Sequence, residues 1–203
     1  MNKKVPLVLW SGGLDSTYLL WCLLSNNTVC DVLYVNVQNN TNMIKQEQAA
    51  IKKLKSILKK ADYSAHIRNE LTYDVPVRSN SSQMTLPQAA IWSEAILWNF
   101  NPNKHSHIEI GYVKGDDFWH YKEAISLYQN HMFKAFLYDD VQIKYPLEWT
   151  PKEEIIKEFK NRKVGIELLK HIRYCEISTT KTPCGKCPSC KKHIISMYSY
   201  EIL

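Results

Sequence analysis

The sequence predicts an α/β fold with a doubly wound, mainly parallel sheet and a small C-terminal zinc-binding element. Three observations support this expectation. Short apolar runs rich in β-branched residues alternate with longer segments whose apolar positions recur at helical spacing. The first apolar run stops at a glycine-rich turn that leads directly into a helical segment. Four of the six cysteines lie within the last 29 residues of the 203-residue chain.

Five strands are expected where short apolar runs are bounded by polar turns. Val5–Trp10 and Asp31–Val37 are mostly apolar along their length, which is typical of strands that are covered on both faces of a sheet. The other three are expected at Tyr63–Arg68, Ile108–Val113 and Val141–Tyr145. Residues 69–85 are polar and are expected to run over the surface without a strand.

Six helices are expected, at Thr17–Leu24, Lys45–Ala61, Gln88–Phe100, Asp117–His131, Lys152–Lys160 and Ile166–His171. In the second of these, the apolar side chains recur at the spacing of one helix face, and the many lysines are expected to form its solvated face. A helix between two strands lets the second strand run in the same direction as the first, so the alternation predicts a parallel sheet.

The balance of charge is mildly basic. The chain has 26 Lys and Arg against 20 Asp and Glu, a formal net charge of +6, which favours anionic partners such as nucleotides. The basic residues are spread along the chain without an aromatic–basic RNA-binding motif, so a nucleic-acid partner is not expected. No apolar run approaches the ~20 residues of a membrane-spanning helix, and the first one is too short for a secretory leader. A cytoplasmic protein with no membrane partner is therefore expected.

The C-terminal cysteines predict a metal site. Cys175, Cys184, Cys187 and Cys190 offer four thiolates, the soft ligands that zinc prefers, and the neighbouring glycine and prolines allow a tight loop. An iron–sulfur cluster would also accept four cysteines. Zinc is the favoured ion, and four protein ligands leave no open position on it, so its expected role is structural.

The strand–turn–helix junction Ser11–Ser16, with the sequence SGGLDS, predicts an anion site. Paired glycines let a ligand approach the main chain, and the first amides of the following helix have no partners within the helix. These amides favour phosphate, and the hydroxyls of Ser11, Ser16 and Thr17 can donate further hydrogen bonds. Asp15 would repel phosphate unless a cation intervenes, which predicts Mg²⁺. Asp15 or Ser16 could alternatively cap the helix, although a cap needs no paired glycines.

The SGGLDS loop resembles the pyrophosphate loop of the PP-loop ATPases, also called N-type ATP pyrophosphatases. Members of that superfamily split ATP between its α and β phosphates and activate a carbonyl or carboxyl oxygen as an adenylate. Together with the late Cys…Cys-Gly-x-Cys-x-x-Cys pattern, the loop resembles the 7-cyano-7-deazaguanine synthase family, QueC. Further matching segments are Asn36–Gln38, Glu47, Gly111 with Asp116 or Asp117, and Pro146–Leu147 followed by Lys152–Ile156.

This resemblance implies an adenine nucleotide alpha hydrolase-like fold. It implies an ATP-binding adenylating domain at residues 1–165 and a C-terminal helix with the zinc element at residues 166–203. ATP, Mg²⁺ and Zn²⁺ are the implied cofactors, and a homodimer is the implied assembly. The expected catalytic residues are Asp15, Lys152 and Asp117. The residues expected to bind ATP are Ser11, Gly12, Gly13, Asp15, Ser16, Thr17 and Gln38.

The implied reaction is ATP-dependent adenylation of the carboxylate of 7-carboxy-7-deazaguanine, or of a close relative. Ammonia then attacks, giving an amide and later a nitrile. The sequence departs from the family at substrate-facing positions, because Pro87–Ala90 lacks the usual Arg and Asn and Gly115–Tyr121 replaces a Tyr-Pro-Asp-Cys-Arg segment. An alternative is therefore a QueC-like defence or phage enzyme that joins the activated deazapurine to another amine, such as one on a protein.

Aromatic residues are candidates for stacking on a purine ring. Phe118 and Trp119 are the preferred pair for this role. Trp92 and Trp98 occur at helical spacing and are expected in the core or at an interface.

Two other kinds of function stay open. A non-catalytic zinc-containing protein that binds a nucleotide or a nucleic acid would explain the charge and the cysteines, but it would not require the intact loop and Lys152. A tRNA thiolase would need a reactive thiol outside the zinc site. Only Cys22 and Cys30 remain for that role, and neither has an evident activating motif.

Overall fold

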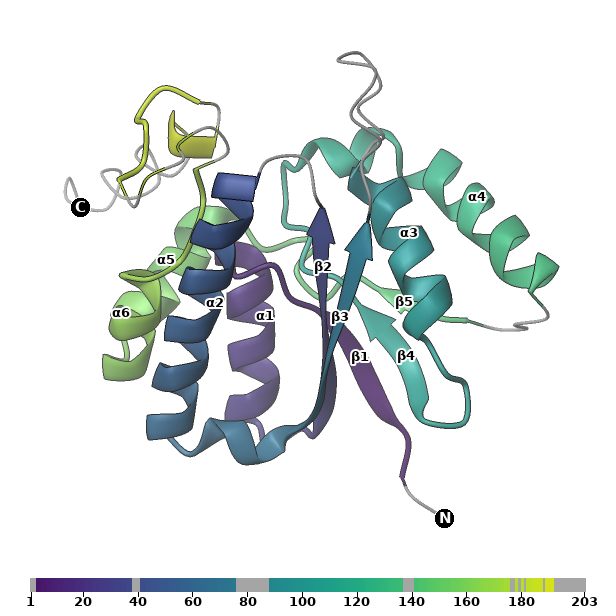
Figure 1. The fold of residues 1–203 in the computed structure, drawn as a ribbon, viewed down its shortest axis with the longest axis horizontal. Helices are drawn as coiled ribbons and strands as arrows, with labels where there is room; N and C mark the ends of the chain where they lie inside the picture. Colours follow the sequence, from purple (N-terminus) through teal and green to yellow (C-terminus); the bar gives the residue numbers. More distant parts are fainter. Residues whose placement is uncertain are drawn as a thin grey trace.

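The computed structural model describes residues 3–37, 41–75, 88–136, 141–175, 178, 180, 182–187 and 189–191. Its centre is a parallel sheet of five strands: β1 (Val5–Leu9), β2 (Cys30–Val37), β3 (Ile67–Val75), β4 (His105–Glu109) and β5 (Ile143–Lys144). Helices cover both faces (Figure 1). The predicted α/β fold with a doubly wound, parallel sheet is confirmed.

The strand order is β3-β2-β1-β4-β5, with β1 in the middle. The chain builds the sheet outward from β1 to β3 and then crosses back to place β4 on the other side of β1. The boundary between β1 and β4 is therefore the topological switch point. In open α/β sheets, ligands bind outside the carboxyl ends of the strands at this point.

The helices form one layer on each face of the sheet (Figure 1). The first layer contains α1 (Leu14–Ser25), α2 (Thr41–Lys60), α5 (Lys152–Lys160) and α6 (Lys163–Leu169). The second contains α3 (Gln88–Asn99) and α4 (Lys122–Ala135). Two short 3₁₀ helices, η1 and η2, lie at Tyr63–His66 and Asp117–His120. Among the described residues, no helix is both long enough and apolar enough to cross a membrane.

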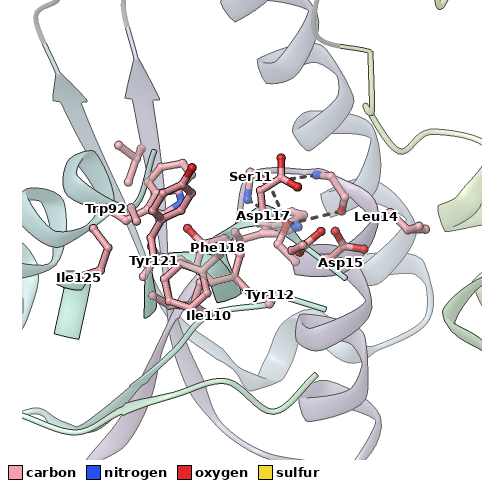
Figure 2. Close-up of a pocket in the computed structure, with 18 of the residues that line it drawn as sticks. Ser11, Leu14, Asp15, Trp92, Ile110, Tyr112, Asp117, Phe118, Tyr121 and Ile125 are labelled. Atoms are coloured by element: carbon pink, nitrogen blue, oxygen red, sulfur yellow. Dashed lines mark hydrogen bonds between the residues drawn. The ribbon is translucent and has the colours of Figure 1, made fainter. Parts of the chain in front are cut away.

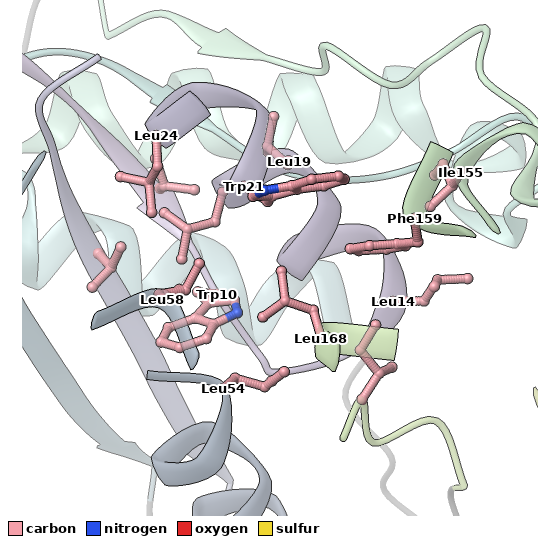
Figure 3. Packing of buried hydrophobic residues seen from close by; sticks show 14 of the residues in the cluster. Trp10, Leu14, Leu19, Trp21, Leu24, Leu54, Leu58, Ile155, Phe159 and Leu168 are labelled. Atoms are coloured by element: carbon pink, nitrogen blue, oxygen red, sulfur yellow. The ribbon is translucent and has the colours of Figure 1, made fainter. Parts of the chain in front are cut away.

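Two apolar clusters attach these layers to the sheet. In the first layer, Trp21 of α1 stacks on Phe159 of α5 with ring centroids 5.2 Å apart, above the buried Trp10 at the end of β1 (Figure 3). In the second, Ile96 and Phe133 belong to the cluster that buries the opposite face of the strands. Burial of each such side chain stabilises the fold by about 1.5–3 kcal/mol. The core thus fixes the strand ends that carry the site.

The third strand lies later in the chain than expected. Tyr63–His66 forms η1, and β3 begins at Ile67 and continues through residues 69–75, which were expected to lack a strand. Leu71 and Tyr73 are half-buried and alternate with exposed polar residues. This alternation follows from the position of β3 at the edge of the sheet, and it makes the segment look polar in sequence.

Other boundaries differ from the expected ones. β4 begins at His105 rather than Ile108, because the His105 side chain is buried in a polar network that the sequence alone does not reveal. The helix expected at Asp117–His131 is divided into η2 and α4. The last expected helix, Ile166–His171, is α6 at Lys163–Leu169.

Candidate active site

The loop between β1 and α1 is folded around its two serines. The hydroxyls of Ser11 and Ser16 are 3.0 Å apart, and the N–H of Gly13 donates to Ser11 Oγ at 3.3 Å. Gly12 has a φ of +75°, which glycine adopts without strain. The N-cap of α1 is Gly13, while Asp15 and Ser16 lie inside its first turn, so neither is the helix cap. The first amides of a helix have no partners within the helix, so this turn suits an anion.

Gly111 brings the chain after β4 close to this first turn. A Cβ atom at this position would lie 3.1 Å from backbone atoms of Asp15 and Ser16. Any side chain larger than hydrogen would push the two segments apart. The glycine therefore allows the residues after β4 to stand beside the loop.

Lys152, the first residue of α5, joins two carboxylates in the same region. Its Nζ lies 3.1 Å from Asp15 Oδ2 and 3.4 Å from Asp116 Oδ1. Burial would lower the pKa of Lys152, but the two carboxylates raise it above its ordinary value, so the amine is charged. The N–H of Val113 donates to Asp116 Oδ2 at 3.0 Å and holds that carboxylate in place. The three charged side chains keep 19–25% of their surface exposed, so a ligand can reach them.

A cleft of about 860 Å³ opens at the switch point, beyond the ends of β1 and β4. This volume lies in the range of small-molecule sites. One half of the cleft is polar and contains the Ser11–Ser16 loop, Lys152, Asp116 and Asp117. The other half is apolar and lies over the sheet between α3 and the start of α4 (Figure 2).

Aromatic rings gather in the apolar half. Tyr112 stacks on Phe118, with ring centroids 4.0 Å apart and planes 5° from parallel. Trp92 lines the same part of the cleft, and burial raises the pKa of the Tyr112 hydroxyl above its ordinary value. Tyr121 also lines the cleft, with 63% of its surface exposed. Figure 2 shows these rings on the side of the cleft away from the Ser11–Ser16 loop.

The four C-terminal cysteines converge on one point. Their sulfur atoms all lie within 4.8 Å of one another, and those of Cys184 and Cys190 are 3.8 Å apart. Backbone N–H groups donate to the sulfurs of Cys175, Cys184 and Cys187 at 3.3–3.4 Å. Burial raises the pKa of Cys190 to about 12, and a bound cation is what would favour its thiolate. The cluster could therefore hold a metal ion.

Arg173 connects this cysteine element to the loop after β1. Its backbone N–H donates to the carbonyl of Gly12 at 3.1 Å. Its guanidinium donates to the carbonyls of Ser178 and Thr180, which belong to the loop joining the first two cysteines. Ser189, next to the last cysteine, lines the cleft. The cysteine element thus contributes to the wall of the site.

Most of the predicted site residues meet in the cleft. Its lining includes Ser11, Gly13, Asp15, Ser16, Asp117, Phe118 and Lys152. Their assigned roles stay predictions. The structure shows only that the fold brings them together from three separate segments of the chain.

Other predicted residues do not line the cleft. Thr17 is buried, and its hydroxyl accepts a hydrogen bond from the Trp10 indole at 3.1 Å. Gly12 packs toward α2 and contacts Arg173 instead. The indole of Trp119 donates to the carbonyl of Val113 at 2.6 Å, and its ring packs on a neighbouring tyrosine. Gln38 lies outside the described residues.

Sequence reasoning missed part of the lining. Asp116 was considered beside Asp117, and it is Asp116 that contacts Lys152. Trp92 was expected in the core or at an interface, but it also faces the cleft. Tyr112 and Tyr121 belong to no sequence motif that predicts a role in the site. They only lie close in sequence to Gly111 and Phe118.

A glycine-rich loop, a lysine and carboxylates at the switch point of a parallel sheet are the features of an α/β protein of the PP-loop type. Residues 5–196 match the family described as queuosine biosynthesis protein QueC, and the chain belongs to that family. Its cysteine cluster could bind a metal.

A solved structure shares this fold. It is the U34-tRNA thiolase NcsA from Methanococcus maripaludis with its [4Fe-4S] cluster, at 17% sequence identity and a TM-score of 0.53. The match covers 99% of this chain and 66% of that chain, so this chain spans slightly less than two thirds of the thiolase. A search of curated proteins gives no match.

Proposed function

We propose that this enzyme adenylates the carboxylate of 7-carboxy-7-deazaguanine, or of a close relative, and that a nitrogen nucleophile then attacks the adenylate. The observation that carries the proposal is the single cleft shared by the Ser11–Ser16 loop, Lys152 and an aromatic wall. The loop and the lysine suit a polyphosphate, while the aromatic wall suits a flat ring. Family membership supports the same assignment.

Each polar residue has a distinct role in this proposal. The amides of the Ser11–Ser16 loop bind the β and γ phosphates, and Lys152 stabilises the charge that develops on departing pyrophosphate. Asp15 and Asp116, with Asp117 beside them, are hard oxygen ligands that fit Mg²⁺. When bound, Mg²⁺ would separate these carboxylates from the phosphates and further stabilise the leaving group.

The proposed reaction proceeds by successive displacements. A carboxylate oxygen attacks the α phosphorus of ATP, and the bond to the bridging oxygen breaks to release pyrophosphate. Ammonia attacks the acyl carbon of the adenylate, AMP leaves with the former carboxylate oxygen, and an amide remains after loss of a proton. A second ATP adenylates the amide oxygen in the same way, and departure of AMP with loss of protons gives the nitrile. Adenylation is needed because the oxygen of a free carboxylate is a poor leaving group.

We propose Zn²⁺ as the ion of the cysteine cluster. Four sulfurs placed tetrahedrally about 2.3 Å from one ion lie about 3.8 Å apart. The Cys184–Cys190 sulfur distance is 3.8 Å. An iron–sulfur cluster attaches each thiolate to its own iron atom, which separates the sulfurs further. Because the thiolase NcsA carries such a cluster, metal analysis has to decide between the two.

Thiolation of tRNA is a second candidate because of the likeness to that thiolase. The sequence has two cysteines outside the cluster, Cys22 and Cys30. Burial raises the pKa of both thiols, to about 12 for Cys30, and neither lines the cleft. A sulfur carrier needs an accessible thiolate, so these thiols favour the ligase.

The nitrogen acceptor is left open between ammonia and an amine of another protein, as in a defence or phage enzyme. We also retain as proposals the division into residues 1–165 and 166–203, a homodimer, and a cytoplasmic location. A non-catalytic protein that binds a nucleotide or nucleic acid is the remaining alternative. It would bind ATP without forming AMP.

Mass spectrometry of the products tests the proposal. The protein is mixed with ATP, Mg²⁺, 7-carboxy-7-deazaguanine and ammonium. We expect AMP together with an amide or nitrile. An adenylated deazapurine without amide would indicate another nitrogen acceptor. If no AMP and no modified base form, the deazapurine assignment is wrong.

The metal proposal has a separate test. Purified protein is analysed for zinc and iron, and the Cys187→Ser variant is compared with Cys22→Ser. We expect zinc in the wild-type protein, loss of the metal and of stability in Cys187→Ser, and retention of both in Cys22→Ser, whose thiol lies in α1. Iron in the wild type, or full metal content in Cys187→Ser, would contradict the proposed site.

A further inference from the structure

The apolar half of the cleft is built mainly from carbon atoms. Val35 and Ile110 lie on the sheet beneath it, Ala89 and Trp92 come from α3, and Ile125 comes from α4. Ala89 and Ala124, both in the lining, contribute only a methyl group each. These small residues leave a space that larger side chains would fill.

The charged groups of the described lining all belong to the other half. They are Asp15, Asp116, Asp117 and Lys152. A ring bound between the aromatic side chains would therefore meet no carboxylate, amide or cation from the described residues. Its contacts would be dispersion and stacking.

The buried polar side chains next to α3 bond to one another and to the helix backbone. Behind the wall, Gln129 donates to Ser93 Oγ at 2.9 Å, and Ser93 donates to the Ala89 carbonyl at 2.7 Å. A site that recognises guanine by its hydrogen-bonding edge has to provide donors and acceptors for that edge. Each polar group of the base that is buried without a partner would cost about 1–3 kcal/mol of binding free energy.

We infer that the acid substrate is selected by the flatness and size of its ring system and not by the hydrogen-bonding edge of a purine. This inference rests on the proposed adenylation. The substrate class is flat, fused-ring aromatic carboxylic acids, with the ring in the apolar half and the carboxylate directed toward Lys152. 7-Carboxy-7-deazaguanine belongs to this class. An acid of the same shape whose six-membered ring has no hydrogen-bonding groups belongs to it as well.

Indole-3-carboxylate is the discriminating probe. It keeps the fused five- and six-membered rings and the carboxylate, and it has no hydrogen-bonding edge on the larger ring. The affinities of both acids are measured by calorimetry with the full chain, alone and with a non-hydrolysable ATP analogue and Mg²⁺. A site built on hydrogen bonds rejects an analogue lacking them by about 10⁴–10⁵, whereas an apolar pocket discriminates by about 10–200-fold.

We expect the two acids to differ by less than about 100-fold and to bind together with the ATP analogue. A larger preference for the deazaguanine acid would overturn the inference, as would failure of both acids to bind. Competition between indole-3-carboxylate and the ATP analogue would also overturn it, because the aromatic half would then hold adenine.

A matched pair of variants locates the acid. Ala124 lines the cleft from α4, whereas Ala135 is exposed at the end of the same helix and is not in the lining. Ala124→Leu should weaken both acids at least tenfold and leave the affinity for the ATP analogue unchanged, and Ala135→Leu should change neither. Unchanged acid affinity in Ala124→Leu would place the ring elsewhere and overturn the inference.

Failure of the proposed function gives a different pattern. If both acids bind in the apolar half but no AMP forms with either, the ligase assignment falls and the stacking site remains. If AMP forms from 7-carboxy-7-deazaguanine while indole-3-carboxylate is rejected, the ligase stands and the stacking inference falls.

Discussion

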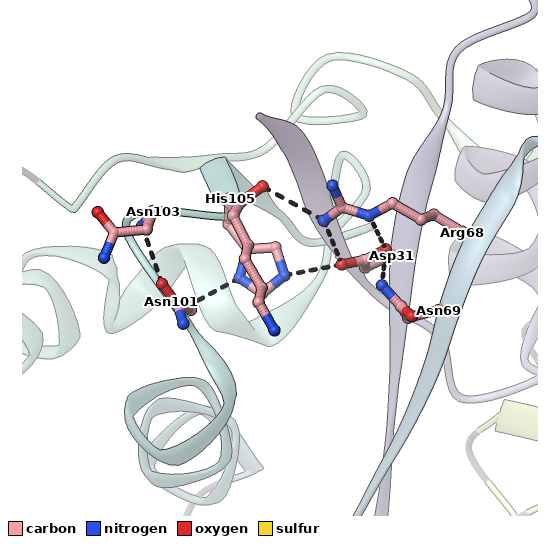
Figure 4. Close-up of polar contacts among 7 residues, drawn as sticks. Asp31, Arg68, Asn69, Asn101, Asn103 and His105 are labelled. Carbon is pink, nitrogen blue, oxygen red and sulfur yellow. Dashed lines mark hydrogen bonds and ion pairs between the residues drawn. The ribbon is translucent and has the colours of Figure 1, made fainter. Parts of the chain in front are cut away.

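Two carboxylate clusters lie at opposite ends of the same sheet. At the amino ends of β2, β3 and β4, the carboxylate of Asp31 accepts hydrogen bonds from Arg68 at 2.9 and 2.6 Å, from Asn69 at 3.0 Å and from His105 Nε2 at 3.0 Å (Figure 4). The Asp31 side chain is only 2% exposed. The N–H of Asn101 donates to His105 Nδ1 at 2.9 Å, so the proton of the imidazole is on Nε2.

The cluster at the carboxyl ends uses similar residue types differently. Asp15 and Asp116 flank Lys152 at 3.1 and 3.4 Å, and each carboxylate keeps about a fifth of its surface exposed, 20% and 19%. The cluster borders the cleft, whereas the Asp31 network does not.

The difference shows which ionic cluster can do chemistry. The carboxylate of Asp31 accepts four hydrogen bonds, so it has little remaining capacity to bind a ligand. Its role is to join three strands. The carboxyl-end groups are charged, reachable and contributed by separate elements. We therefore expect substitutions at the two clusters to have opposite consequences for activity and for stability.

Asp15→Asn should have the largest effect on activity. The change removes the charge expected to bind Mg²⁺, while Lys152 keeps Asp116 as a partner. We expect AMP formation to fall by about 10³-fold or more, as for loss of a group that stabilises developing charge, with a melting temperature close to that of the wild type. The measurement is pyrophosphate release together with thermal unfolding. Unchanged turnover would mean that the loop has no part in the mechanism, and it would contradict the proposed difference between the two carboxylate clusters.

Lys152→Met should lower kcat by about 10²–10³-fold, because the pyrophosphate leaving group loses a fixed positive charge. Lys157→Met is the matched control, since Lys157 is exposed on the same helix, α5, outside the cleft lining. Steady-state kinetics of both variants with ATP and the acid give the test. Equal effects of the two substitutions would indicate a general loss of positive charge rather than a role at one site.

Asp31→Asn should reverse the pattern. Removing the charge leaves Arg68 without its carboxylate and the His105 N–H with a weaker acceptor. We expect the free energy of unfolding to drop by about 3 kcal/mol, because one partner of a buried ionic network is lost. Turnover per folded molecule should be unchanged. Denaturant unfolding is the measurement, with Asp62→Asn as an exposed control. A loss of kcat without loss of stability would contradict the structural role.

Much of the fold is predictable because burial on both faces leaves a clear pattern. β1 is a continuous apolar run and is buried along its whole length. The edge strand β3 was misplaced because only one of its faces is covered, and its exposed polar positions hide the strand. The start of β4 was missed because His105 is polar yet buried, and the partner that permits this, Asp31, is 74 residues away in sequence.

The polar half of the site was predictable for a different reason. A loop that presents amides to a phosphate needs a local sequence, so SGGLDS is recognisable without the fold. The aromatic half has no such local signature. Trp92, Tyr112 and Tyr121 come from separate segments, and only the packing of α3, the chain after β4 and α4 places them around one space. The sequence also does not reveal that Asp116, rather than Asp117, contacts Lys152. That contact depends on a turn in which the N–H of Val113 donates to the Asp116 carboxylate.

The smallest expected effect concerns pH. Burial lowers the pKa of His105 despite the opposing effect of Asp31. Burial alone would raise the pKa of Asp31, but its hydrogen bonds with Arg68, His105 and Asn69 lower it. For both groups the unfolded chain binds protons more readily than the folded one, so stability is lost as the pH falls. For His105 the loss begins below its unfolded value of about 6.5.

The free energy of unfolding should therefore decline between pH 7 and pH 5, by at most about 1.4 kcal/mol per pH unit from one histidine. His105→Gln should be less stable at pH 7 but show a flatter dependence, and His131→Gln, an exposed change on α4, should keep the wild-type slope. Lys152 stays charged throughout this range because its pKa is raised. If His105→Gln keeps the wild-type dependence of unfolding free energy on pH, a group other than His105 takes up the proton. The Asp31 network would then not be the pH-sensitive end of the sheet.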